Sequence, residues 1–209
     1  MKKLIISLFI IILLTIGLIL WCNSNDNNKQ GQTNTSNYQA QKSDTNINAN
    51  TTNVVRKKET EIATFSTKIY NKNDARQNNI GITCRSLSTK EVNPGEIFSF
   101  CNTVGKSTTE KGYKEADIYV DGKKEQGLGG GNCQVSTTLY NAVLKVPELE
   151  VIERHQHSGK VPYIKEGKDA AVSYGAYDLK FKNNSNNTIK IIMENTTDEV
   201  TAKLIKIEK

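Results

Sequence analysis

Residues 127–144 read GLGGGNCQVSTTLYNAVL, so four glycines within five residues lead directly into a cysteine and an apolar run. Glycine is costly in regular structure, but it adopts positive φ angles and allows other groups to approach closely. Three apolar residues then recur at the spacing of one buried helical face: Val135, Leu139 and Val143. The stretch therefore predicts a glycine loop followed by a helix over residues 134–144, with Cys133 at its beginning.

Strand-like segments separated by turn signals surround this helix. They are rich in β-branched and aromatic residues, and they span 60–70, 96–100, 117–120, 148–153, 171–175, 177–183, 188–195 and 199–208. Asp121-Gly122 is typical of a hairpin turn, and a slip in the alternation predicts a β-bulge near Leu204-Ile205. A second amphipathic helix is expected over 73–88, with Cys84 facing the core. We expect an α+β fold, a single compact domain with a small, mostly antiparallel sheet and a few helices.

The N-terminal quarter of the chain has a different composition. Residues 4–21 carry no charge over 18 positions and follow Lys2 and Lys3, which predicts a transmembrane signal anchor over residues 1–22. Lipidation at Cys22 or cleavage remains an alternative. Residues 23–53 are polar and nearly free of aliphatic side chains, which is typical of a disordered linker. The folded domain should then span 54–209 and lie outside the cytoplasm, at the cell wall, on a single-pass membrane protein.

The charge balance and the cysteines indicate which partners, disulfides and metal sites to expect. The chain has 28 Lys+Arg against 22 Asp+Glu, a mixed and mildly basic balance that favours an anionic cell wall over nucleic acid as partner. Of the four cysteines, Cys84 and Cys101 could form a disulfide, whereas Cys22 lies at the predicted membrane edge. The chain has no CxxC motif, so we expect no metal site.

Cys133 is the candidate nucleophile. Unsatisfied N–H groups and a partial positive charge at a helix N-terminus stabilise a thiolate, which is the reactive form of cysteine. The same N–H groups can stabilise the oxyanion of an acyl-transfer intermediate. Asn132 is the candidate N-cap. We therefore expect an oxyanion and substrate loop with six members: Gly129, Gly130, Gly131, Asn132, Gln134 and Ser136.

A general base should accompany the cysteine. The only histidines, His155 and His157, follow Cys133 by 22 and 24 residues, and alternate residues of an extended segment share one face. Either can therefore point at Cys133. A third group usually orients such a base, and Asp169 is the first candidate, with Ser158 or a backbone carbonyl as alternatives.

Each of these residues also has a purely structural interpretation. A cysteine at a helix start is commonly a small buried residue, a glycine run is commonly a loop, and a single histidine is more often structural than catalytic. The residue pattern alone therefore leaves the catalytic role of Cys133 open.

Three segments, 93–123, 127–144 and 151–184, together resemble the VanW domain family, which covers about residues 73–184. The motif Gly-Gly-Gly-x-Cys-Gln-Val-Ser-Thr-Thr-Leu-Tyr-Asn-Ala is long and specific. The resemblance implies that Cys133 is a nucleophile. It favours His157, in the His157-Ser158 pair, over His155 as the base, and it places Asp169 in the family's Gly-Lys-Asp-Ala stretch.

The resemblance also implies an activity, namely L,D-transpeptidation of peptidoglycan, in which Cys133 forms 3-3 cross-links between stem peptides. Neither a cofactor nor a metal is required. The expected partners are the stem peptides and, through the N-terminal helix, the membrane, with the protein acting as a monomer. A cysteine peptidase or amidase on the same stem peptides, and a non-catalytic wall-binding module, remain the alternatives.

Overall fold

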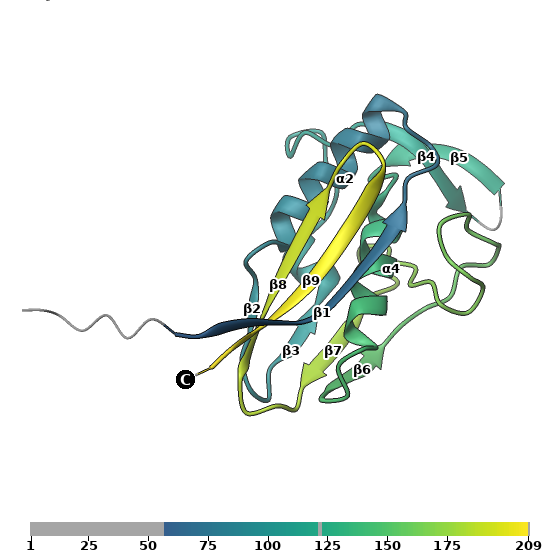
Figure 1. Cartoon of the computed structure of the whole chain (residues 1–209). Helices are drawn as coiled ribbons and strands as arrows, with labels where there is room; N and C mark the ends of the chain where they lie inside the picture. The colour runs from purple at the N-terminus through teal and green to yellow at the C-terminus, as the bar shows by residue number, and fades with distance from the viewer. Residues whose placement is uncertain (1–56, 121–122, 209) are drawn as a thin grey trace, which may run out of the picture. The chain divides into compact units, whose positions relative to one another are not determined.

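The computed structural model describes residues 57–120 and 123–208 (Figure 1). The predicted anchor over 1–22, the predicted linker over 23–53 and the predicted Asp121-Gly122 turn lie outside these residues. Within the described ranges, no helix has both the length and the hydropathy needed to cross a bilayer.

A four-stranded antiparallel sheet forms one layer of the fold. Its order is β1-β9-β8-β2, from β1 (Glu59–Lys68), β9 (Glu199–Ile207), β8 (Thr188–Asn195) and β2 (Glu91–Val92). Alternate residues of the two central strands face the core, as the period of a strand requires: Ile189, Ile191, Met193, Val200, Ala202 and Leu204. The strands predicted over 60–70, 188–195 and 199–208 are confirmed, whereas the two-residue β2 was too short to be predicted.

The bulge predicted near Leu204-Ile205 lies instead in the strand that pairs with these residues, β1. The pairing of β8 with β9 is continuous, but the register of β1 against β9 shifts between Glu61 and Ala63. Ile205 pairs with Glu61 and Leu204 with Ala63, so Ile62 is the extra residue. The alternation in the sequence reveals the slip of phase, but it does not reveal which strand carries the bulge.

Two helices contact each other and cover one face of this sheet (Figure 1). Helix α2 (Asp74–Leu87) lies against β8, and helix α4 (Asn132–Val143) lies against β9 and β1. Both confirm the predicted helices. Cys84 is 2% exposed and faces the core as expected, and burial raises the pKa of its thiol to about 12. It is a free cysteine, as is Cys101, so the disulfide left open by the sequence is absent.

A second, three-stranded antiparallel sheet lies beside the first. Its order is β3-β7-β6, from β3 (Ile97–Ser99), β7 (Lys180–Asn183) and β6 (Leu149–Glu153). The Phe98 and Phe181 rings stack across it with centroids 4.8 Å apart. The short helix α3 (Phe100–Val104) follows β3 directly and was not predicted.

The strand predicted over 171–175 is wrong. This region forms only two isolated bridges, His155 with Ala171 and Ser173 with Tyr177, because its backbone turns back on itself after Ser173. The remaining strands form a hairpin, β4 (Glu115–Val120) with β5 (Lys123–Leu128), which leads into the glycine loop. The described domain is therefore α+β with antiparallel pairing, but it has two sheets and a hairpin in place of one sheet.

Candidate active site

Helix α4 begins at Asn132, two residues before the predicted start at residue 134. Its N-cap is Gly131, which has a φ of 118° and contributes no side-chain cap, so Asn132 is the first helical residue and the predicted Asn132 cap is wrong. The Asn132 amide instead accepts from Thr83 Oγ1 at 2.7 Å and donates to Ser107 Oγ at 3.0 Å. Cys133 thus occupies the second position of the helix, within the turn where N–H groups lack intrahelical partners.

The glycine loop, Gly129, Gly130 and Gly131, is required by packing against the protein itself. A Cβ on Gly130 would lie 2.7 Å from the Asp117 carbonyl oxygen of β4. A Cβ on Gly131 would lie 2.7 Å from Ile80 of α2, and its positive φ is strained for any other residue. Because the loop has no side chains, the start of α4 packs closely between the hairpin and α2. This packing fixes the position of Cys133.

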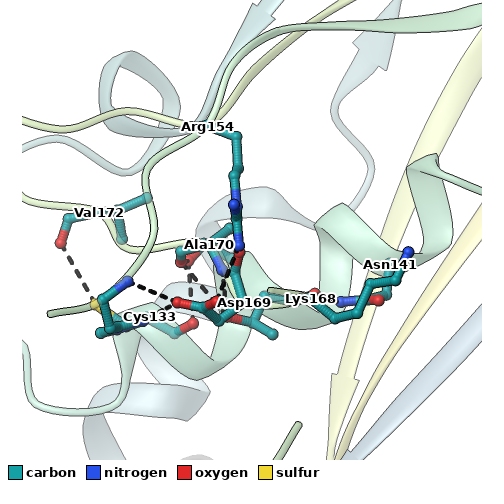
Figure 2. Close-up of polar contacts among 10 residues, drawn as sticks. Cys133, Asn141, Arg154, Lys168, Asp169, Ala170 and Val172 are labelled. Atoms are coloured by element: carbon teal, nitrogen blue, oxygen red, sulfur yellow. Dashed lines mark hydrogen bonds and ion pairs between the residues drawn. The ribbon is translucent and has the colours of Figure 1, made fainter. Parts of the chain in front are cut away.

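Polar side chains on the buried face of α4 hold residues 168–172, called here the docked segment, against the helix (Figure 2). Ser136 Oγ donates to the Ala170 carbonyl at 2.6 Å, and the Ala170 N–H donates to Thr137 Oγ1 at 2.9 Å. One turn further on, Asn141 Nδ2 donates to the Lys168 carbonyl at 2.7 Å. Ser136 and Thr137 are fully buried, so these bonds form out of contact with water.

The docked segment brings its Val172 carbonyl to Cys133, and it also holds the segment that carries the histidines. Its Val172 carbonyl lies 3.5 Å from Cys133 Sγ, as Figure 2 shows. Its Ala171 N–H donates to the His155 carbonyl at 2.8 Å, which places the histidine-bearing segment alongside. This contact brings Asp169 next to His157.

Asp169 holds His157 at two points. The backbone N–H of His157 donates to Asp169 Oδ2 at 2.7 Å, and His157 Nδ1 lies 2.5 Å from the same oxygen. Arg154 binds the other side of Asp169, through Nη2 to Oδ1 at 2.9 Å and through Nε to the carbonyl at 2.5 Å (Figure 2). The side chains of His157 and Asp169 are 12% and 5% exposed, so both are shielded from water.

The charges of this group act on one another. Burial works to lower the pKa of His157, but the hydrogen bond and the charge of Cys133, followed by those of Asp169, raise it above the ordinary histidine value overall. Burial works to raise the pKa of Asp169, but its bonds with His157 outweigh this effect and lower it. Because Nδ1 faces Asp169, Nε2 is the ring nitrogen left to interact with Cys133, whose effect on the pKa of His157 shows that the two side chains are close. A thiol, an imidazole and a carboxylate that orients the imidazole can together perform nucleophilic chemistry.

The other residues proposed for the site do not join this group. His155 lies 2.9 Å from Glu153 Oε1 through Nε2, and its ring packs on Tyr177 at 4.7 Å. Ser158 is exposed, and its side chain has no hydrogen bond to another described residue. Gln134 is 1% exposed and donates to Thr67 and Lys68, so its side chain anchors α4 to β1. In the same way, the buried Ser136 side chain has a structural contact, its hydrogen bond to the docked segment.

Cys133 and His157 open into a cavity of about 620 Å³, a size suited to a small ligand or a peptide. Its walls come from α2, α3, the β4–β5 hairpin and the loop before the docked segment. Tyr163 of that loop also lines the cavity, and burial raises the pKa of its hydroxyl. Among the described residues, no group of three His, Cys, Asp or Glu side chains is placed to share a metal ion.

Sequence reasoning missed three polar residues at this site: Arg76, Arg154 and Tyr163. Arg154 precedes His155 directly, so a charged side chain in the histidine segment was the available signal. Arg76 reaches the site from a helix far away in sequence, and no local pattern indicates this contact.

Comparison with known proteins gives one family. A family model described as VanW like protein matches residues 75–205. The chain is 37% identical over 159 residues to the uncharacterized protein YoaR of Bacillus subtilis, which aligns 71% of this chain with 52% of YoaR. It is 34% identical over 118 residues to the vancomycin B-type resistance protein VanW of Enterococcus faecalis, which aligns 54% of this chain with 42% of that protein.

The chain thus spans about half the length of the curated relatives it matches. No solved structure matches it significantly.

Replacing Ser136 with alanine should loosen the docked segment. The change removes the short bond to the buried Ala170 carbonyl and leaves it only the long bond from Thr137 Oγ1 at 3.4 Å, so we expect the free energy of unfolding in urea to fall by about 1–3 kcal/mol. Ser86→Ala on α2 is the matched control, because that hydroxyl is exposed and the change should cost less than about 0.5 kcal/mol. Equal losses in the two variants would contradict the importance of the contact.

The pKa of His157 should fall when either charged neighbour is removed. Cys133→Ala and Asp169→Asn each delete a group that favours the imidazolium, whereas Cys101→Ala should leave the pKa unchanged. The measurement is an NMR pH titration of the His157 ring, assigned with a His155→Gln variant. An unchanged pKa in both variants would refute the interaction.

The raised pKa of His157 also makes the stability of the fold depend on pH. Because the folded-state pKa of His157 is raised, its contribution to stability is complete below about pH 6.5 and disappears as the pH rises through the folded-state value.

Proposed function

This chain belongs to the VanW-like protein family, and from that premise and the geometry around Cys133 we propose that it is a cysteine-dependent acyltransferase. Its proposed reaction is L,D-transpeptidation, in which two peptidoglycan stem peptides are joined by a 3-3 cross-link. One relative is a vancomycin resistance protein, which favours the cell wall as the site of action. With the predicted N-terminal anchor, the domain would act outside the cytoplasmic membrane.

One observation carries this proposal: Cys133 at the start of α4 faces a histidine whose other ring nitrogen lies 2.5 Å from a buried aspartate. A histidine held in this way keeps one tautomer and one orientation, which a general base requires. A structural cysteine has no need of such a partner. The cavity at Cys133 leaves room for a substrate on the open side.

In the proposed first step, His157 Nε2 takes the thiol proton, and Cys133 Sγ attacks the carbonyl carbon of the diamino acid at position three of a tetrapeptide stem. Asp169 stabilises the resulting imidazolium. His157 then gives the proton to the amide nitrogen of the terminal D-alanine. This residue leaves as the free amino acid, and a thioester remains on Cys133.

The oxyanion in this step needs a hydrogen-bond donor. The N–H groups of Asn132 and Gln134 already donate to the Gly129 and Gly131 carbonyls, each at 3.0 Å. The N–H of Cys133 itself makes no hydrogen bond within the described part of the chain, and it points out of the first turn of α4. We assign this group the role of oxyanion donor, assisted by the dipole of the helix.

In the second step, the side-chain amine of an acceptor stem attacks the thioester carbonyl. His157 removes the proton of this amine, the new amide bond forms, and the Cys133 thiolate leaves. Water in place of the amine would give hydrolysis, so peptidase activity uses the same residues. The choice between the two depends on how well the acceptor excludes water from the cavity.

Mixing the full-length protein with a tetrapeptide stem tests the proposal. Intact-protein mass spectrometry should show an adduct equal to the stem minus D-alanine on the wild type and none on Cys133→Ala. Asp169→Asn should lower the rate of adduct formation by about 100-fold or more, because the base loses its orienting partner. Cys101→Ala is the control, and it should keep its adduct.

The products then separate the alternatives. Stem dimers joined between two diamino acids indicate transfer, and shortened monomers indicate hydrolysis. A folded wild-type protein that forms no adduct and releases no D-alanine would refute both activities and favour a wall-binding module.

A further inference from the structure

Two exposed tyrosines line the cavity that holds Cys133, and the acyl-transfer steps described above use neither of them. Tyr70 is 64% exposed and Tyr174 is 58% exposed. Neither side chain makes a hydrogen bond or a ring contact within the described part of the chain. A single exposed apolar residue is ordinary on a protein surface, but aromatic side chains that share one cavity indicate a surface that binds a ligand.

Tyr174 lies on a short turn whose position is fixed relative to Cys133. The Val172 carbonyl is 3.5 Å from Cys133 Sγ, and Tyr174 follows two residues later, so its Cα lies within about 11 Å of the sulfur. Two backbone hydrogen bonds between Ser173 and Tyr177, each at 2.9 Å, close the turn. A ring on a fixed turn binds a ligand with little further loss of conformational entropy.

Tyr70 comes from a different segment, between β1 and α2, that is held at the same end of α4. Gln134, which follows the cysteine directly, donates through Nε2 to the Lys68 carbonyl at 2.9 Å, two residues before Tyr70. Asn71, directly after the tyrosine, donates to Asp117 Oδ2 of β4 at 3.0 Å. The two tyrosines therefore belong to two separately anchored walls of one cavity.

The groups beside these rings suit a sugar. Asn71 follows Tyr70 and Ser173 precedes Tyr174, and both of these neutral polar residues also line the cavity. Amides and hydroxyls can hydrogen-bond to the hydroxyls of a sugar. A tyrosine ring has apolar faces and a polar tip, which matches a pyranose ring with an apolar C–H face and polar edges.

The proposed substrate carries a sugar at a matching distance. In peptidoglycan, the first residue of each stem peptide is joined to an amino sugar of the glycan strand. The carbonyl that Cys133 attacks belongs to the third residue, so an extended stem places the sugar roughly 10 Å from the sulfur. Tyr174, whose Cα lies within about 11 Å of the same atom, is in this range.

Building on the proposed function, we propose that Tyr70 and Tyr174 form a sugar-binding subsite, where their rings pack against the glycan that carries the donor stem. The subsite distinguishes a stem attached to glycan from a free peptide of the same sequence. It does so because aromatic contacts with the sugar add binding energy that a free peptide lacks.

A test must compare two ligands that differ only in the sugar. We would titrate the full-length Cys133→Ala protein calorimetrically with a tetrapeptide stem capped by lactate and with the same lactyl stem on its disaccharide. The disaccharide form should bind about tenfold or more tightly. Adding Tyr70→Ala or Tyr174→Ala should reduce this preference to about threefold or less, by weakening only the disaccharide form.

Two further sets of variants serve as controls. Tyr70→Phe and Tyr174→Phe keep the ring faces and should keep most of the preference. Tyr177→Ala removes a 51% exposed tyrosine from the same turn as Tyr174, but this tyrosine does not line the cavity, so the preference should remain. Thermal melting of each variant checks the fold.

Four results would overturn the inference: no tighter binding of the disaccharide form, a preference that survives both alanine substitutions, equal weakening of both ligands in these variants, or loss of the preference in the control variants. Because binding is measured without the thiol, the two proposals fail separately. A sugar preference with no adduct on the wild type would refute acyl transfer and leave the subsite standing, whereas an adduct with no sugar preference would refute the subsite alone.

Discussion

The hydrogen bonds between α4 and the docked segment hold the whole site together. A helix packed against a sheet normally buries apolar side chains, but α4 also buries the hydroxyls of Ser136 and Thr137. A buried hydroxyl needs a hydrogen-bond partner, and both of these bind the backbone of Ala170. This pairing fixes a segment that has no strand partner of regular length, and with it the aspartate that orients His157.

Electrostatics then distinguishes Cys133 from the other described thiols. Burial, followed by the negative charge of Asp178, raises the pKa of Cys101 to about 12, and burial alone has a similar effect on Cys84. Both therefore remain protonated at neutral pH. Cys133 has a histidine partner and a helix N-terminus instead, and although burial works to raise the pKa of the Asp169 carboxyl, its bonds with His157 keep this pKa below its usual range. The site combines a buried carboxylate, a half-buried thiol and a cationic wall within one cavity.

Much of this could be predicted from local pattern. The spacing of apolar residues predicted α4, and its junction with the glycines placed Cys133 at the helix start. The structure also brings His157 and Asp169 together, as the sequence suggested. Other features depend on contacts distant in sequence. The glycines before Cys133 are needed because β4 and α2 pack closely against them. Residues 171–175 form isolated bridges in place of a strand, and Arg76 reaches the cavity from α2. Periodicity carries no information about such contacts.

The central claim is that His157 and Asp169 make Cys133 the reactive thiol of this domain. The most direct test is alkylation by iodoacetamide at pH 7, with the modified positions mapped by peptide mass spectrometry in the wild type and in His157→Gln. The account predicts that Cys133 is modified well before Cys84 and Cys101, and that the histidine variant slows this reaction. Modification of Cys133 no faster than Cys101, or at the same rate without His157, would contradict it.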